Sequence, residues 1–115
     1  MNNTNVTEKA MAFAARIINL HKFLVEKNNE RVISPHIIKC GTVIGAHLSA
    51  AFAAQAQNVK NDQLTRALTE TATTEYWLKL LQHTGNIGID TTRSLLADCN
   101  EIKRLIVEDI NAENI

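Results

Sequence analysis

The sequence predicts an all-α protein, a single domain folded as an antiparallel, up-down four-helix bundle. Its 115 residues suit one domain with a sizeable core and leave no room for a second catalytic module. The composition is 45% hydrophobic with one proline and few aromatic residues, which favours helices over strands. Four stretches place apolar residues at spacings of three and four, and the short connectors between them require neighbouring helices to run antiparallel.

The first helix is expected over about residues 7–28, with Thr7 as its N-cap. Its apolar stripe comprises Ala10, Phe13, Ile17, Leu20 and Leu24. The second helix is expected over about residues 34–57, because Ser34 is a suitable N-cap and Pro35 fits the first helical position. Its stripe comprises Ile37, Gly41, Ile44, Leu48 and Ala51.

The third helix is expected over about residues 61–84, capped by Asn61 or Asp62. Its stripe comprises Leu64, Ala67, Thr71, Thr74, Leu78 and Leu81. Gly85 then stands where a left-handed residue commonly ends a helix. The fourth helix is expected over about residues 90–112, beginning near Asp90. Its stripe comprises Leu95, Cys99, Ile102, Leu105, Ile106 and Ile110.

The charges balance in number but not in position. Twelve Lys and Arg match twelve Asp and Glu, and zero net charge argues against a general polyanion-binding protein. Residues 1–60, however, contain seven bases and three acids, which gives +4, and residues 61–115 contain five bases and nine acids, which gives −4. Such a dipolar domain can pair its charges within one chain or between copies.

The cysteines and the N-terminal residues predict a cytoplasmic protein. Cys40 and Cys99 both fall in apolar helical patterns, and two buried thiols are no disulfide framework. Residues 1–7 are polar and do not form a signal peptide. The least polar stretch, residues 40–57, is too short and too weakly hydrophobic to span a membrane.

No residue pattern predicts catalysis, a metal, a cofactor or a small-molecule substrate. The Glu-x-x-His motif of di-iron bundles is missing, and His36 with Cys40 would make only half a metal site. The remaining ligands would have to come from His21, His83 or Cys99. Cys40 and His47 are about 10 Å apart along a helix, which is too far for a hydrogen bond. We therefore expect no catalytic residues.

Small residues in the second predicted helix are candidates for close packing. Gly41 and Gly45 are four residues apart, a spacing that lets a neighbouring backbone approach. Further small side chains follow towards the end of the helix, at Ala50, Ala53 and Ala54. The small side chains either fit around larger residues of the same bundle or form a contact with another subunit.

Basic residues of the first half are candidates for binding nucleic acid. They are Lys9, Arg16, Lys22, Lys27, Arg31 and Lys39. Their alternative role is to keep a helix face in water, which is the commoner use of such charges.

Several strings of the sequence resemble a family of bacterial four-helix bundles. They are KCGTVIGAH at residues 39–47, ALTE at 67–70, EYWLKLL at 75–81, TG at 84–85 and SLL at 94–96. Together they resemble the protein encoded in intervening sequences of 23S ribosomal RNA genes, to which the accessory variability protein of diversity-generating retroelements is similar. The resemblance covers roughly residues 9–110, and the order and spacing of the strings carry it.

The resemblance implies a non-enzymatic, intracellular protein that assembles as a ring, typically a homopentamer. Some members bind nucleic acid or a reverse transcriptase. The family usually has Arg-Ser at Lys39 and Cys40, Asn at His47, Glu at Ala50 and an acid at Thr73. Glu70 matches the family, so His47 with Glu70 is expected to replace the family's polar network.

The sequence thus predicts a homo-oligomeric accessory or scaffold protein. Its partner would be a second copy, RNA or DNA, or a nucleic-acid-processing protein such as a reverse transcriptase. The alternative is an adaptor of the same fold that binds only proteins.

Overall fold

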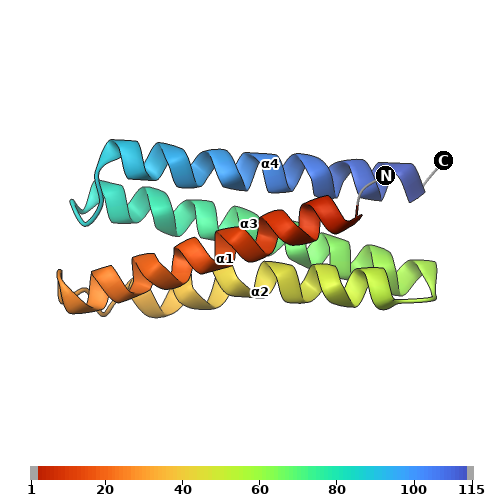
Figure 1. Cartoon of the computed structure of the whole chain (residues 1–115), viewed down its shortest axis with the longest axis horizontal. Coiled ribbons are helices and arrows are strands. Elements are labelled where there is room, and N and C mark those ends of the chain that lie inside the picture. Colours follow the sequence, from red (N-terminus) through yellow and green to blue (C-terminus); the bar gives the residue numbers. More distant parts are fainter. Residues whose placement is uncertain (1–2, 114–115) are drawn as a thin grey trace.

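The computed structural model describes residues 3–113 and consists of four antiparallel helices (Figure 1). They are α1 (Asn3–Glu26), α2 (Ser34–Ala53), α3 (Gln57–His83) and α4 (Ile89–Glu113). The bundle measures 46 × 21 × 19 Å, and no strand occurs among the described residues. This confirms the predicted all-α, up-down bundle.

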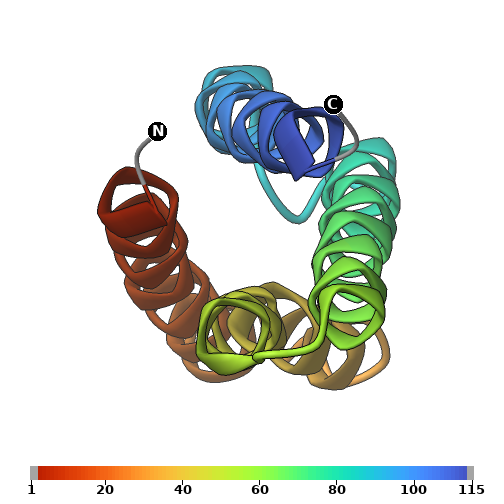
Figure 2. The same ribbon diagram turned by 90° about the vertical axis from the view of Figure 1, so that its right-hand side faces the viewer.

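The helices follow one another around the bundle axis in chain order (Figure 2). Each helix packs on the next one in the sequence, and α2 with α3 forms the most extensive contact. The contact between α1 and α4 is the smallest. α1 is the first helix and α4 the last, so no turn joins them. The line along which they meet, the α1–α4 seam, is the open side of the bundle.

The core consists of the predicted apolar stripes. Every stripe member predicted on α1, α2 and α3 is buried, and on α4 only Leu105 and Ile110 are partly exposed. The two buried threonines of the α3 stripe satisfy their hydroxyl groups within the helix. Thr71 Oγ1 donates to the Ala67 carbonyl and Thr74 Oγ1 to the Glu70 carbonyl, each at 2.8 Å. The spacing of apolar residues by three and four positions therefore identified the buried faces correctly.

The start of α1 differs from the prediction. The helix includes Asn3, so Thr7 lies inside it rather than capping it. Val6 is fully buried and extends the apolar stripe one turn before Ala10. Burial of this extra turn favours the longer helix over a start at Thr7.

The turn between α2 and α3 also lies elsewhere than predicted. α2 ends at Ala53, where Ala54 adopts an extended conformation (φ −71°, ψ 138°), and α3 begins at Gln57. Asn61 is inside α3 and accepts a hydrogen bond from Gln57 Nε2 at 3.1 Å. Asp62 is also inside α3, so neither residue is the cap. The break contains neither glycine nor proline, which is why the sequence pattern missed it.

Gly85 ends α3 as predicted. It has φ +80°, and its N–H donates to the Gln82 carbonyl at 3.0 Å. The Asn86 N–H donates to the Leu81 carbonyl at 2.8 Å, which completes a Schellman motif. The short α3–α4 loop is therefore defined by hydrogen bonds to the last turn of α3.

The start of α2 is capped by a residue that the sequence analysis did not single out. The Glu30 carboxylate accepts hydrogen bonds from the N–H groups of Val32, Ile33 and Ser34 at 2.7–3.1 Å. Ser34 is already helical, and its hydroxyl donates to the Glu30 carbonyl instead of capping. Partial burial raises the pKa of Glu30, but the three backbone donors outweigh it and hold the pKa below its ordinary value.

Candidate functional site

The basic residues of α1 do not form one stripe. Lys9 Nζ lies 3.9 Å from Glu101 of α4, and Arg16 Nη1 lies 2.7 Å from Asp98 of α4. Arg16 Nη2 also donates to Ser94 Oγ at 3.0 Å. Two of the six nucleic-acid candidates are therefore engaged across the α1–α4 seam.

The other four candidate bases, Lys22, Lys27, Arg31 and Lys39, lie exposed at one end of the bundle. They surround the turn between α1 and α2, at the end where the α3–α4 loop also lies (Figure 1). Arg31 Nε donates to Asn29 Oδ1 at 3.0 Å. None of the four forms an ion pair with any residue within 3–113. The cationic surface is thus a cluster at one end, which we call the basic end.

The glycines of α2 pack against α1 of the same chain. A Cβ atom added at Gly41 would lie 2.9 Å from Ile17 Cγ1, and one added at Gly45 would lie 3.7 Å from Ala10 Cβ. The first distance is shorter than van der Waals contact, so Gly41 permits the close approach of α1. Two roles were considered for these glycines, packing within the bundle and contact with another subunit. Both glycines face α1 of the same chain, which is the first of these roles.

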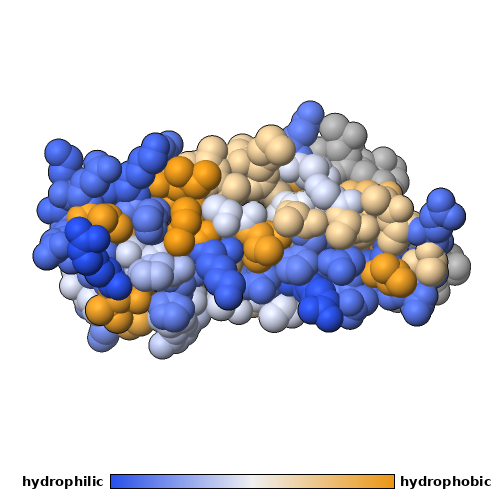
Figure 3. Space-filling view, turned by 90° about the horizontal axis from the view of Figure 1, so that it is seen from below, coloured by the Kyte–Doolittle hydropathy of each residue, from blue (hydrophilic) through white to orange (hydrophobic). Residues whose placement is uncertain are grey.

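The alanines of the small-residue stretch face outward. Ala50 and Ala53 are exposed, and Ala54 is half-buried in the turn. Ala10 and Ile17 of α1 contact the glycines of α2. The next residue after each of them, Met11 and Ile18, is exposed and lies beside α2. Seen over α2 in Figure 3, weakly and strongly apolar side chains form a band between these two helices. We call this surface the α1–α2 face.

The predicted pair of His47 and Glu70 does not form. His47 Nδ1 lies 2.9 Å from Gln63 Oε1 on α3. The turn at Ala54 sets the antiparallel register of α2 and α3. A residue a given number of positions before the turn therefore lies beside a residue about the same number of positions after it. Glu70 is two helical turns farther along α3 and lies near Cys40, with which it lines a hollow. The family resemblance indicated the pair, but the helix register decided that Gln63 is the partner of His47.

That hollow, of about 310 Å³, combines polar and aromatic groups from α2 and α3. The His36 ring stacks on Trp77 with centroids 4.6 Å apart, and Tyr76 meets Trp77 edge-on at 5.1 Å. Lys39 and Glu70 line it beside them. The stacking was not predicted, because His36 and Trp77 are far apart in sequence and meet only through the α2–α3 register.

Comparison with known proteins identifies the family. The family model of the 23S rRNA-intervening sequence protein matches residues 2–108. The chain belongs to the 23S rRNA-intervening sequence protein family. A solved structure from Bacteroides thetaiotaomicron, a protein with unknown function from the S23 ribosomal protein family, is 40% identical. It superposes with a TM-score of 0.95 and covers 96% of this chain and 99% of its own. No curated protein matches the sequence.

In this member of the 23S rRNA-intervening sequence protein family, the positions that differ from the family's usual residues lie along α2 and α3. Lys39, Cys40 and Thr73 line the α2–α3 hollow, and His47 bonds Gln63 beyond it. Ala50 is exposed on the outside of α2. The polar contacts between α2 and α3 therefore consist of separate pairs rather than one connected network.

The two thiols of this family member are buried, and burial raises the pKa of each. Thr74 Oγ1 lies 3.1 Å from Cys40 Sγ, and burial raises the pKa of Cys40 despite this contact. Burial, together with Glu75 and Asp98, raises the pKa of Cys99 to about 12. Across residues 3–113, no group of three or more His, Cys, Asp and Glu side chains is placed to hold a metal ion. Nor is any helix in that range long and apolar enough to cross a membrane.

Proposed function

We propose that this family member is a non-enzymatic scaffold or accessory protein that assembles with copies of itself into a ring, typically a pentamer. The observation that carries the proposal is the α1–α2 face, where Met11 is 71% and Ile18 is 42% exposed beside the small residues of α2. Small side chains allow another helix to approach closely, and apolar area gains free energy when it is covered.

A second apolar surface on α3 supports a ring rather than a simple dimer. Tyr76 is 59% exposed and, with Leu68 and Trp77, lines a shallow hollow of about 560 Å³. This surface and the α1–α2 face lie on different helices of the same chain. A ring needs two different patches on each subunit, because each copy contacts the next head to tail.

Light scattering coupled to size-exclusion chromatography tests the assembly. The expected mass is five times the 12.8 kDa of one chain. Ala53→Arg on the α1–α2 face and Tyr76→Arg on α3 should each reduce the mass, because both place a charge in the contact. Ala97→Arg, on the exposed side of α4, is the matched control and should leave it unchanged. A mass of one chain for the wild-type protein would refute the proposal.

Nucleic acid is the partner that the basic end favours for this scaffold. Lys22, Lys27, Arg31 and Lys39 are exposed together, and a ring of parallel subunits would repeat them along one rim. Repetition converts a weak patch into a multivalent one. A nucleic-acid-processing protein such as a reverse transcriptase would reach the basic end through the nucleic acid that it binds.

Binding of a short RNA measured by fluorescence anisotropy tests this partner. Affinity should fall steeply with added salt, and Lys22→Glu with Lys27→Glu should weaken it at least tenfold, about 1.4 kcal/mol. Arg66→Glu, towards the opposite end, makes the charge change of one such replacement and should weaken binding less than Lys22→Glu alone. Binding that is absent or independent of salt would favour the alternative, an adaptor that binds only proteins.

A further inference from the structure

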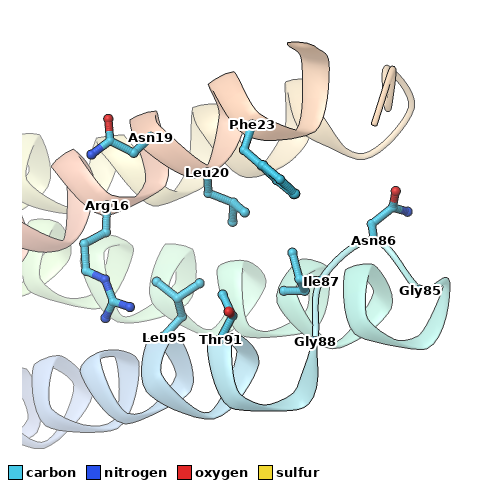
Figure 4. A pocket seen from close by; sticks show the side chains of 10 residues that line it. All are labelled: Arg16, Asn19, Leu20, Phe23, Gly85, Asn86, Ile87, Gly88, Thr91 and Leu95. Atoms are coloured by element: carbon cyan, nitrogen blue, oxygen red, sulfur yellow. The ribbon is translucent and has the colours of Figure 1, made fainter. Parts of the chain in front are cut away.

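A cavity of about 500 Å³ lies between α1, α4 and the α3–α4 loop, on the open side of the bundle (Figure 4). Neither the basic end nor the α1–α2 face includes it. Its volume is within the range of sites that hold small organic molecules.

Hydrogen bonds bridge the seam at both ends of the cavity. At one end Arg16 bridges α1 to Asp98 and Ser94 of α4. At the other end, Asn28 Nδ2 donates to the Asn86 carbonyl at 3.0 Å and joins the turn after α1 to the α3–α4 loop. A peptide helix lying along the seam would have to break these bonds. The space between these two bridges therefore suits a small molecule better than a protein segment.

The walls of the cavity are apolar. Leu20, Ile87 and Leu95 are buried beneath it, and Phe23 is 44% exposed above them. In Figure 4 these four side chains point into the same space between α1 and α4, and Thr91 joins them from the first turn of α4. Such walls favour an aliphatic or aromatic body, since covering Phe23 would remove a large apolar surface from water.

The polar groups that line the cavity are spread along it, with Arg16 at one end and Asn86 at the other (Figure 4). Among the described residues that line it, Arg16 is the one with a charge. Its guanidinium group has five N–H donors, and the hydrogen bonds to Asp98 and Ser94 use one on Nη1 and one on Nη2. Asp98 fixes the orientation of the group and leaves donors for a second acceptor. Asn19 also lines the cavity, with its amide directed away from the guanidinium group (Figure 4). A carboxylate is the head group that the guanidinium donors bind best.

We propose that this cavity binds a small amphiphilic carboxylate, with its aliphatic or aromatic body against Phe23 and Leu95 and its carboxylate on Arg16. The site is independent of self-assembly, because none of these residues belongs to the α1–α2 face or to the apolar surface of α3.

Isothermal titration calorimetry of the full chain with decanoate tests the proposal, and decanol and decylamine serve as matched ligands. Decanoate should bind saturably with one molecule per chain, and decylamine at least tenfold more weakly because it presents a cation to Arg16. Decanol binding as tightly as decanoate would overturn the assignment of the head group. Absence of saturable decanoate binding would overturn the site.

Two variants locate the binding. Thr91→Phe fills the cavity from an exposed position of α4 and should abolish decanoate binding, whereas Arg93→Phe places the same side chain on α4 outside the cavity and should not. Arg16→Gln should weaken decanoate about tenfold or more and leave decanol unchanged. Equal effects of the two Phe variants, or equal loss of both ligands in Arg16→Gln, would contradict the proposed geometry. Circular dichroism melting of each variant confirms that it is folded.

Discussion

Substitution of Gly41 by Ala tests whether the approach of α1 to α2 depends on a missing side chain. The new Cβ would lie 2.9 Å from Ile17 Cγ1 and 3.0 Å from Ile17 Cγ2. Both atoms are attached directly to Cβ of a β-branched residue that has one preferred rotamer in a helix. The Ile17 side chain therefore cannot turn away, and the two helices must separate.

The size of the effect follows from two opposing terms. Overpacking a core costs about 1–3 kcal/mol, and replacing Gly by Ala in a helix returns about 1 kcal/mol. Because two carbon atoms of Ile17 are approached, we expect the upper half of the first range. The net destabilisation of Gly41→Ala should then be about 1–2 kcal/mol, or roughly 4–8 °C in Tm.

Gly45→Ala is the matched control, because it makes the same change one turn along the same helix. Its Cβ would lie 3.7 Å from Ala10 Cβ, an ordinary contact, so the helix term should dominate. We expect it to stabilise the protein by about 0.5–1 kcal/mol. Urea unfolding followed by circular dichroism, at one fixed protein concentration, measures both free energies of unfolding.

A double-mutant cycle separates the contact with Ile17 from other causes. In an Ile17→Ala background the methyl group of Gly41→Ala has space, so its cost should shrink by about 1 kcal/mol or more. The reasoning would be refuted if Gly41→Ala stabilised the protein, or if its effect were the same in both backgrounds.

Three further predictions concern the cap, the thiols and the ion pair between α3 and α4. Glu30→Gln should destabilise the protein by about 1 kcal/mol, the usual value of a lost cap. Because the pKa of Glu30 is lowered in the folded state, its contribution is present above the ordinary value of 4.5 and is lost as pH falls through the lower folded value. Acid unfolding curves of wild type and variant should therefore converge at low pH, and curves that stay parallel would count against the cap. Iodoacetamide at pH 8 should alkylate Cys99 roughly a thousandfold more slowly than a free thiol, because its pKa is raised to about 12, and rapid labelling of the native protein would contradict its burial. Lys103 Nζ lies 2.8 Å from Glu75 Oε1 with the carboxylate 14% exposed, so a double-mutant cycle should give about 1 kcal/mol of coupling, more than the exposed pair of Arg104 with Glu108.

The sequence was sufficient to predict the four helices and their buried faces. Burial of an amphipathic helix depends on the spacing of its apolar residues, and this information is local. The stripe of α3 shows this best, since even Thr71 and Thr74 were assigned to the core on position alone. Gly85 was identified for a similar reason, because its left-handed conformation strongly favours glycine.

The helix ends and the partners of polar residues were not available from the sequence. α2 ends at Ala53 among alanines and glutamines, with no residue that requires a break. That turn sets the register of α3 on α2, which joins His47 to Gln63 and His36 to Trp77. A shift of one turn would give each of them another partner.

The charges show the same division between sequence and tertiary structure. The sequence by itself determined that bases predominate in the first half of the chain and acids in the second. Only the tertiary structure decided that Arg16 pairs with Asp98 across the α1–α4 seam, while Lys22 and Lys27 remain exposed at the basic end. Periodicity specifies which face of a helix is buried, but an ion pair requires two side chains from distant parts of the chain to meet within a few ångströms. That distance depends on helix register and packing, which the turns and the core set together.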